Sequence, residues 1–203
     1  MRVGVLASGE GTNLQALLDA VHGREADIVA VASDTPGAPA LQRAVQAGVR
    51  TAVFPAAEHP GRAARDAALA DWLDAEGVGL CVLAGYMALL DAAFVRRFAG
   101  RLVNVHPSLL PAFPGLRAIE QALDYGVKVF GVTVHLVDEG VDTGPVLAQR
   151  AVELPGARTP AEVRTTLRPL EHALLCDVVR RFARGDVRPD PAHSRRWLVG
   201  PAG

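Results

Sequence analysis

The sequence predicts an α/β protein with a mostly parallel sheet covered by helices on both faces. Short apolar runs typical of buried strands alternate with longer segments of helical periodicity along most of the chain. The 203 residues are 50% hydrophobic, which is enough for one domain with a sizeable core. We therefore expect a single domain, 1–203, with an N-terminal half of about 1–100, a C-terminal half of about 101–185 and a tail, 186–203.

The strands and helices are expected in a regular order. Pro39 and Pro60 suit first-turn positions of helices, and Gly48 and Gly77 suit positions just after helix ends. Strands are predicted at 2–7, 27–33, 51–54, 79–84, 101–105, 129–137 and 145–152. Helices are predicted at 12–22, 38–47, 60–76, 91–98, 117–124 and 160–184.

The C-terminal part departs from this alternation. The runs 129–137 and 145–152 are joined only by the loop 138–144, which predicts a hairpin-like or bent pair late in the sheet. Pro169 falls inside the last helical pattern, so we expect that helix to kink there or to split near residue 168. The tail after Gly185 is rich in Pro and Arg and is expected to pack loosely.

Composition excludes several classes of partner. A net charge of −1 gives no electrostatic reason to expect nucleic acid or a membrane surface. No apolar run is long enough to span a bilayer, and the N-terminus lacks the core of a signal peptide. Cys81 and Cys176 have no metal-binding or redox spacing, and they are interpreted as small buried side chains. We expect a cytoplasmic protein.

A Gly-rich turn follows the first predicted strand, in the stretch Ser8-Gly9-Glu10-Gly11-Thr12-Asn13. Two glycines allow a sharp turn, Thr12 or Asn13 can cap the next helix, and the free N–H groups of that helix form an anion site. A plain strand–helix turn is an equal alternative. The pattern is neither a P-loop nor a complete dinucleotide fingerprint, which argues against a nucleotide triphosphate or a nicotinamide cofactor.

An amide and an imidazole stand two residues apart where the run 101–105 ends. Positions i and i+2 of an extended chain lie on the same side, so Asn104 and His106 can face one reacting centre. Asn104 is expected at the end of the strand, where ligands bind in open α/β sheets. The amide can donate to an oxyanion, and the imidazole can share that role or move a proton. The alternative is a capping Asn and a structural loop His.

Asp142 lies on a glycine-bearing loop and can orient the His106 ring by accepting a hydrogen bond from it. Asp138 and Glu139 are competing carboxylates that we interpret as solvated loop charges. His135 lies among apolar neighbours and is interpreted first as a buried, hydrogen-bonded residue. A zinc site formed by His106, His135 and Asp142 is a further alternative that no paired Cys or His spacing supports.

Four motifs together resemble those of the phosphoribosylglycinamide formyltransferases, the folate-dependent enzymes of purine synthesis. The similarity runs from residue 1 to about 184, with the motifs in the family's order and spacing. The motifs are Ser8-Gly9-x-Gly11-Thr12-Asn13, Leu83-Ala84-Gly85-Tyr86-Met87, Asn104-x-His106-Pro107-Ser108-Leu109-Leu110-Pro111 and Val137-Asp138-Glu139-Gly140-Val141-Asp142-x-Gly144-Pro145.

The resemblance implies a formyltransferase-type, Rossmann-like fold with a late antiparallel strand. It implies that the amine of 5'-phosphoribosylglycinamide (GAR) attacks the formyl carbon of 10-formyltetrahydrofolate, with no metal and no covalent enzyme intermediate. Asn104 and protonated His106 would stabilise the oxyanion, Asp142 would anchor His106 and assist a water-mediated proton transfer, and His135 would support them. The partners would be these small molecules, with no nucleic acid or membrane, and the protein would be a monomer or a homodimer.

The resemblance also implies binding residues. For GAR these are Gly11, Thr12, Asn13 and Glu171, and for the folate they are Arg62, Met87, Ala88, Leu89, Leu90, Val95, Asp138, Glu139, Gly140 and Val141. Without the resemblance, the apolar members of this set read as core, and Arg62 and Glu171 read as solvated helix positions.

Three departures from the family pattern affect substrate contacts and leave the catalytic set untouched. Ala88 stands where many relatives carry Arg beside the folate pocket. Arg117 and Glu120 replace the usual arrangement of charges, and Pro169 lies two residues before Glu171.

Three other activities remain open from the sequence. A 10-formyltetrahydrofolate hydrolase can use the same three residues with water as acceptor, but such enzymes usually carry an extra N-terminal domain. Formyl transfer to methionyl-tRNA would need an additional C-terminal domain and a basic surface. A folate- or nucleotide-binding module without catalysis would keep the pocket and lose the chemistry, which the intact Asn104, His106 and Asp142 argue against.

Overall fold

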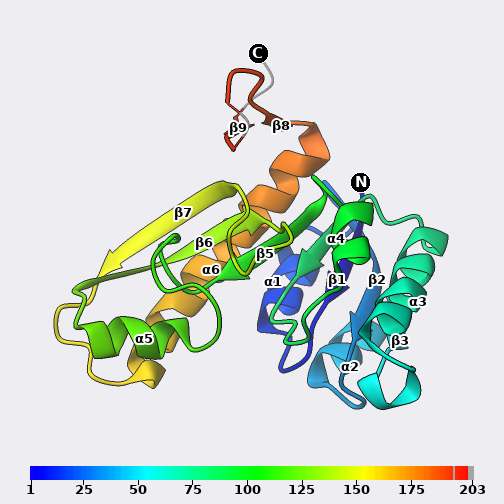
Figure 1. Cartoon of the computed structure of the whole chain (residues 1–203), viewed down its shortest axis with the longest axis horizontal. Coiled ribbons are helices and arrows are strands. Elements are labelled where there is room, and N and C mark those ends of the chain that lie inside the picture. The colour runs from blue at the N-terminus through cyan, green and yellow to red at the C-terminus, as the bar shows by residue number, and fades with distance from the viewer. Residues whose placement is uncertain (194, 201–203) are drawn as a thin grey trace. The chain divides into compact units, whose positions relative to one another are not determined.

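The computed structural model describes residues 1–193 and 195–200 and divides the chain into two compact units (Figure 1). The first unit comprises Met1–Asn104 and the second begins at Val105. This division neither confirms nor contradicts the expected single domain with halves of about 1–100 and 101–185, which stays a prediction.

The first unit is built on parallel strands. Its strands are β1 (Arg2–Leu6), β2 (Asp27–Ser33), β3 (Arg50–Val53), β4 (Leu80–Leu83) and β5 (Leu102–His106), whose last two residues belong to the second unit. They lie in the order β3-β2-β1-β4-β5, and each neighbouring pair is parallel. Val5 lies opposite Val31 on one side and Val82 on the other, and all three side chains are fully buried.

Two pairs of helices cover this sheet. The helices are α1 (Thr12–Ala20), α2 (Pro39–Gln46), α3 (Arg62–Ala75) and α4 (Ala92–Arg97), with a short 3-10 helix, η1 (Ala56–Glu58), before α3. α1 packs on α2 and α3 packs on α4. The chain runs outward from β1 to β3 and returns to β4 on the other side of β1. Right-handed crossovers therefore place the two pairs on opposite faces, as the sequence predicts.

The second unit combines an antiparallel strand pair with a long helix. Strands β6 (Val129–Leu136) and β7 (Val146–Glu153) pair antiparallel, with Thr133 opposite Gln149. Helix α6 (Pro160–Arg184) packs against both strands and against α5 (Ala118–Tyr125). Figure 1 shows α6 in orange running along the yellow-green strands. The predicted α/β class with a late antiparallel strand is thus confirmed.

Two local predictions are wrong. α6 continues through Pro169, so the expected split does not occur. Proline removes one helical hydrogen bond, at about 3 kcal/mol, and burial of the apolar face of α6 against β6 and β7 offsets this loss. Pro60 precedes α3, because extended Gly61 takes the N-cap. Pro39, Gly48 and Gly77 lie where the sequence predicts them, at the start of α2 and just after α2 and α3.

The tail is more ordered than the sequence predicts. Strands β8 (Val187–Pro189) and β9 (Trp197–Val199) pair antiparallel, and β9 contacts β7. An ion pair of 2.5 Å between Arg196 and the buried Asp190 holds the connection between the two strands. The rest of the predicted tail, residues 194 and 201–203, lies outside the described residues.

Two further findings bear on the sequence interpretation. Cys81 and Cys176 are buried free thiols, as predicted. Within residues 1–193 and 195–200, no helix combines the length and the apolar character that crossing a membrane requires.

Candidate active site

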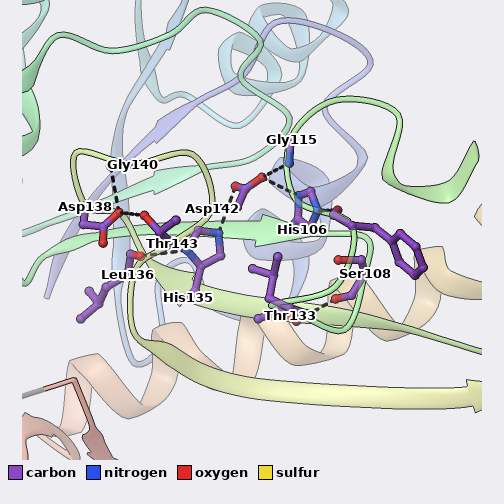
Figure 2. A network of polar contacts seen from close by, with 12 residues as sticks. His106, Ser108, Gly115, Thr133, His135, Leu136, Asp138, Gly140, Asp142 and Thr143 are labelled. Carbon is purple, nitrogen blue, oxygen red and sulfur yellow. Dashed lines mark hydrogen bonds and ion pairs between the residues drawn. The ribbon is translucent and has the colours of Figure 1, made fainter. Parts of the chain in front are cut away.

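The second unit gathers a carboxylate and two imidazoles in one cluster (Figure 2). The Asp142 carboxylate lies 3.3 Å from Nδ1 of His106 through Oδ2 and 3.4 Å from Nε2 of His135 through Oδ1. His106 comes from the end of β5, His135 from β6, and Asp142 from the loop between β6 and β7. Both imidazoles are at most 5% exposed, so the cluster is screened little by solvent.

The His106 ring is held at both nitrogens. Its Nε2 lies 2.9 Å from the carbonyl oxygen of Phe113, while Nδ1 faces Asp142. Both neighbours are oxygen acceptors, so a protonated ring can donate to both, whereas a neutral ring can donate to only one. The two contacts therefore fix the orientation of the ring.

The loop 138–144 positions Asp142 through its own backbone. Asp142 has a φ of 53°, a left-handed conformation that Asp tolerates better than most residues. Oδ1 of Asp138 accepts hydrogen bonds from the Gly140 N–H at 3.1 Å and the Thr143 hydroxyl at 2.6 Å. A Cβ at Gly144 would overlap the carbonyl oxygen of Leu136, so glycine is required there. Asp138 thus organises the loop, and its interpretation as a merely solvated charge is wrong.

The Asp142 carboxyl group is ionised at neutral pH. Burial alone would raise its pKa, but the contact with His135, the hydrogen bond from the Gly115 N–H at 2.8 Å and the charge of His106 outweigh burial. Together they lower the pKa of Asp142 from its ordinary 3.8 to about 2. Asp142 is therefore available as a permanent anion beside His106.

His135 is buried and hydrogen-bonded, as its first interpretation from sequence expects. Its Nδ1 lies 2.8 Å from the carbonyl oxygen of Leu136, and its other nitrogen faces Asp142. It also contributes to the low pKa of Asp142, so a purely structural interpretation understates its contacts. For the zinc alternative, the described part of the chain offers no group of three or more His, Cys, Asp or Glu placed to hold a metal ion.

Asn104 lies on β5, two residues before His106. The strand continues to His106, so the expectation that Asn104 ends the strand is wrong by two residues. Alternation along β5 still directs both side chains to the same side of the strand. Asn104 is half-buried, which leaves part of its side chain accessible.

The sequence did not predict a network of hydrogen bonds that holds the 108–113 turn. The buried Thr133 hydroxyl donates to the Ser108 carbonyl at 2.7 Å and accepts from the Leu110 N–H at 3.1 Å. The Ser108 hydroxyl donates to the Ala112 carbonyl at 2.6 Å, just before Phe113 (Figure 2). The carbonyl of Phe113 and the N–H of Gly115 are backbone groups, so residue types alone gave no signal for them.

The Gly-rich turn of the first unit leads directly into α1. Gly11, with a φ of 72°, takes the N-cap of α1, so the prediction that Thr12 or Asn13 caps this helix is wrong. Thr12 is instead the first helical residue, and Asn13 is 9% exposed. Arg43 of α2 braces the turn by donating to the Glu10 carbonyl at 2.7 Å. Glycine at the N-cap leaves room for an external anion at the first N–H groups.

The predicted folate residues of the first unit lie mainly after β4. Met87 and Leu89 are each 64% exposed, which is unusual for large apolar side chains. Ala88 and Leu90 are half-buried, and Val95 is buried in α4. Arg62, at the start of α3, is exposed.

The remaining predicted residues lie in the second unit. Glu139, Gly140 and Val141 are exposed on the loop before Asp142, and Glu171 is half-buried on α6. Of the departures from the family pattern, Arg117 takes the N-cap of α5 with a φ of 60°. Glu120 forms an ion pair of 3.4 Å with Arg164 of α6.

Comparison with known proteins identifies close relatives. A family model described as formyl transferase matches residues 1–179. A trifunctional purine biosynthetic protein adenosine-3 from Drosophila melanogaster is 52% identical over 157 residues, 75% of this chain. The chain spans only 12% of the length of that relative.

Shorter relatives match over most of their length. A phosphoribosylglycinamide formyltransferase from Mycobacterium tuberculosis strain H37Rv is 43% identical, over 90% of this chain and 85% of that protein. The crystal structure of glycinamide ribonucleotide transformylase 1 from Symbiobacterium toebii superposes with a TM-score of 0.92 at 45% identity. The superposition covers 98% of this chain and 93% of the Symbiobacterium toebii chain.

Proposed function

The chain belongs to the formyl transferase family, and from this premise we propose that it transfers a formyl group from 10-formyltetrahydrofolate to the amine of 5'-phosphoribosylglycinamide. The products are the formylated ribonucleotide and tetrahydrofolate, in the synthesis of purines. The observation that carries the proposal is the ionised Asp142 carboxylate held against the His106 ring at 3.3 Å.

The chemistry requires a stabilised oxyanion and a proton acceptor. Attack of the amine on the formyl carbon gives a tetrahedral intermediate whose oxygen carries negative charge. The Asn104 amide donates to that oxygen, the positive charge of a protonated His106 ring stabilises it, and Asp142 keeps the His106 ring oriented. Asp142 assists the transfer, through a water molecule, of a proton from the attacking amine to the departing nitrogen of the folate, and the intermediate then collapses to the formamide and neutral tetrahydrofolate. His135 contacts the other carboxylate oxygen of Asp142, Oδ1, through its Nε2.

The acceptor substrate carries a phosphate, for which the Gly11 turn is suited. We assign the phosphate to the N–H groups at the start of α1, with Thr12 and Asn13 beside it. Glu171 contacts the glycinamide portion. An anion site at a helix N-terminus binds phosphate at any pH near neutrality, because no titrating side chain is needed.

The donor carries a flat pterin ring, for which the exposed apolar segment after β4 is suited. We assign apolar contacts with the ring to Met87, Leu89, Leu90 and Val95, and polar contacts with it to the backbone of 138–141. Arg62 meets the glutamate tail of the folate. Ala88 gives no charge there, so Arg62 carries that role alone among the predicted folate residues.

The direct test is a spectrophotometric assay with a 10-formyl folate, run with and without the glycinamide ribonucleotide. The proposal expects release of tetrahydrofolate only when the ribonucleotide is present. Equal release without it would instead support a hydrolase with water as acceptor. Binding of both ligands without turnover would support a non-catalytic module, and activity only with methionyl-tRNA would support the third alternative.

The setting of the reaction follows from the same premise. We place it in the cytoplasm, where two buried free cysteines stay reduced. The partners are the two small molecules, and a monomer or a homodimer would serve the chemistry equally.

A further inference from the structure

The segment from Gly85 to Asp91, between β4 and α4, has neither helix nor strand structure, and exposed residues alternate in it with half-buried ones. Gly85, Met87 and Leu89 are exposed, whereas the side chains between them are half-buried. Large apolar side chains that are exposed together mark a candidate ligand-binding surface. What keeps this segment in place therefore affects the ligand site it forms.

Side chains from elsewhere in the first unit hold the backbone of this segment at three points. The Met87 N–H donates to the Ser8 hydroxyl oxygen at 2.8 Å. The Leu89 carbonyl accepts from Nη2 of Arg65 at 2.9 Å. The Asp91 N–H donates to Oδ2 of Asp66 at 2.6 Å. The anchored residues are 87, 89 and 91, so two of the three anchors hold the backbone of the residues whose side chains are exposed.

Two of these anchors form a buried ion pair on α3. Arg65 and Asp66 are 6% and 1% exposed, and Nε of Arg65 donates to Oδ1 of Asp66 at 2.7 Å. A buried ion pair often contributes little net stability compared with apolar side chains of the same size. Here one further atom of each partner bonds the backbone of the 85–91 segment, Nη2 of Arg65 and Oδ2 of Asp66, so the pair can fix that segment.

The third anchor is itself held by a carboxylate. The Ser8 hydroxyl donates to Oδ1 of Asp34 at 2.5 Å, which leaves its lone pairs for the Met87 N–H. Ser8 follows β1 and Asp34 follows β2, so the ends of two neighbouring parallel strands fix the segment that follows a third, β4.

We propose that Ser8, Arg65 and Asp66 are positioning residues that preorganise the 87–90 segment for the folate donor. The inference rests on the proposed function for the identity of the ligand. Without the anchors the segment samples other conformations, and binding the pterin ring must then order it again. Loss of an anchor therefore weakens donor binding and leaves the catalytic step, which uses other residues, nearly unchanged.

The sharpest test compares Ser8→Ala with Ser8→Thr. Alanine removes the hydroxyl, whereas threonine keeps it. We expect Ser8→Ala to raise the KM for the donor about tenfold, as the loss of one hydrogen bond worth about 1.4 kcal/mol would do. The value of kcat should change less than about threefold, and Ser8→Thr should restore the donor KM.

A second pair of variants tests the ion pair. Asp66→Asn removes the charge and keeps the volume, and we expect a similar rise in the donor KM. Asp71→Asn is the matched control, because Asp71 lies on the same helix and pairs with Arg97 through an exposed contact of 2.7 Å. An unchanged donor KM in Ser8→Ala, with only a lower melting temperature, would overturn the proposal.

Calorimetric titration with a stable 10-formyl folate analogue separates this proposal from the proposed function. If the parent protein lacks formyl transfer yet binds the analogue, the weaker binding is still expected in Ser8→Ala and not in Ser8→Thr. If the parent protein transfers the formyl group and Ser8→Ala binds the analogue as tightly as the parent, the positioning role fails alone. A parent protein that neither transfers the formyl group nor binds the analogue would overturn both.

Discussion

The two units use different chemical groups at their candidate sites. In the first unit, the groups offered to ligands are backbone N–H groups at Gly11 and the exposed apolar side chains Met87 and Leu89. In the second unit, they are titratable side chains, with the Asp142 carboxylate contacted by two imidazoles. Recognition of a phosphate or a flat ring needs fixed shape and dipoles, whereas proton transfer needs groups that can change charge.

The backbone conformations differ in the same way. Among the described residues of the first unit, only glycines have positive φ, whereas Phe113, Arg117 and Asp142 of the second unit adopt it without being glycine. Such conformations cost about 1–3 kcal/mol each and persist where the surroundings enforce them. Asp142 belongs to the cluster, and the carbonyl oxygen of Phe113 lies 2.9 Å from Nε2 of His106. The strain is therefore concentrated where the proposed chemistry takes place.

The largest expected effect comes from the oxyanion donors. Asn104→Ala and His106→Ala should each lower kcat by about 10²–10³-fold, the usual effect of losing one such donor. The KM values should change little, because substrate binding depends on other groups. Steady-state kinetics with circular dichroism as a folding control checks this. Near-normal turnover in both variants would show that the cluster is structural.

The next largest expected effect is on how the free energy of unfolding depends on pH. The pKa of Asp142 lies at about 2 in the fold against an ordinary 3.8, so its charge stabilises the folded state. This contribution is fully present above pH 3.8 and is lost as the pH falls toward 2. Asp142→Asn should therefore lower the free energy of unfolding at pH 7, and the difference from the parent protein should be smaller at pH 3. Urea unfolding at both pH values measures it, and a difference that grows on acidification would contradict the assignment.

Substitution of glycine tests the first unit. A Cβ at Gly11 would lie 2.7 Å from Cβ of Ala40, and its φ of 72° disfavours alanine. Gly11→Ala should lower stability by more than the roughly 1 kcal/mol of the conformation alone and raise the KM for the ribonucleotide. Gly48→Ala is the control, with a φ of 71° and no atom within 4 Å of the added Cβ. Equal melting temperatures in the two variants would contradict the crowding of Gly11 by Ala40. Equal ribonucleotide KM values would contradict the assignment of the phosphate to this turn.

The smallest expected effect involves the tail. Nη2 of Arg195 donates to the Thr143 carbonyl at 2.7 Å, next to Asp142, but the bond is exposed. Arg195→Ala should lower kcat/KM by less than about threefold, because exposed bonds contribute little. A loss as large as that of His106→Ala would mean that the tail, and not the loop 138–144 itself, sets the position of Asp142.

Sequence reasoning succeeded where a feature depends on periodicity. The α/β class and the late antiparallel pair followed from alternating apolar runs, and Pro39, Gly48 and Gly77 marked helix ends correctly. Sequence reasoning failed where contacts between segments far apart in the sequence determine the local structure. Burial of α6 overrides Pro169, and contact of β9 with β7 orders a tail whose composition indicates a loose end.

At the candidate site, too, some residues could be predicted from the sequence and others could not. The ionisable residues His106 and Asp142 could be selected from sequence because their chemistry is specific. The anchors Ser8, Arg65 and Asp66 could not be selected, since their role depends on backbone groups that only folding brings within reach. Likewise, the Phe113 carbonyl and the Gly115 N–H exist in every sequence and become informative only through their position.

The most direct measurement follows an isotopic label in the formyl group of 10-formyltetrahydrofolate through a single turnover with the glycinamide ribonucleotide. We predict that the label appears in the amide of the ribonucleotide product, with one equivalent of tetrahydrofolate, and that His106→Ala slows its appearance by about 10²–10³-fold. Label recovered as formate, whether or not the ribonucleotide is present, would contradict formyl transfer by this cluster.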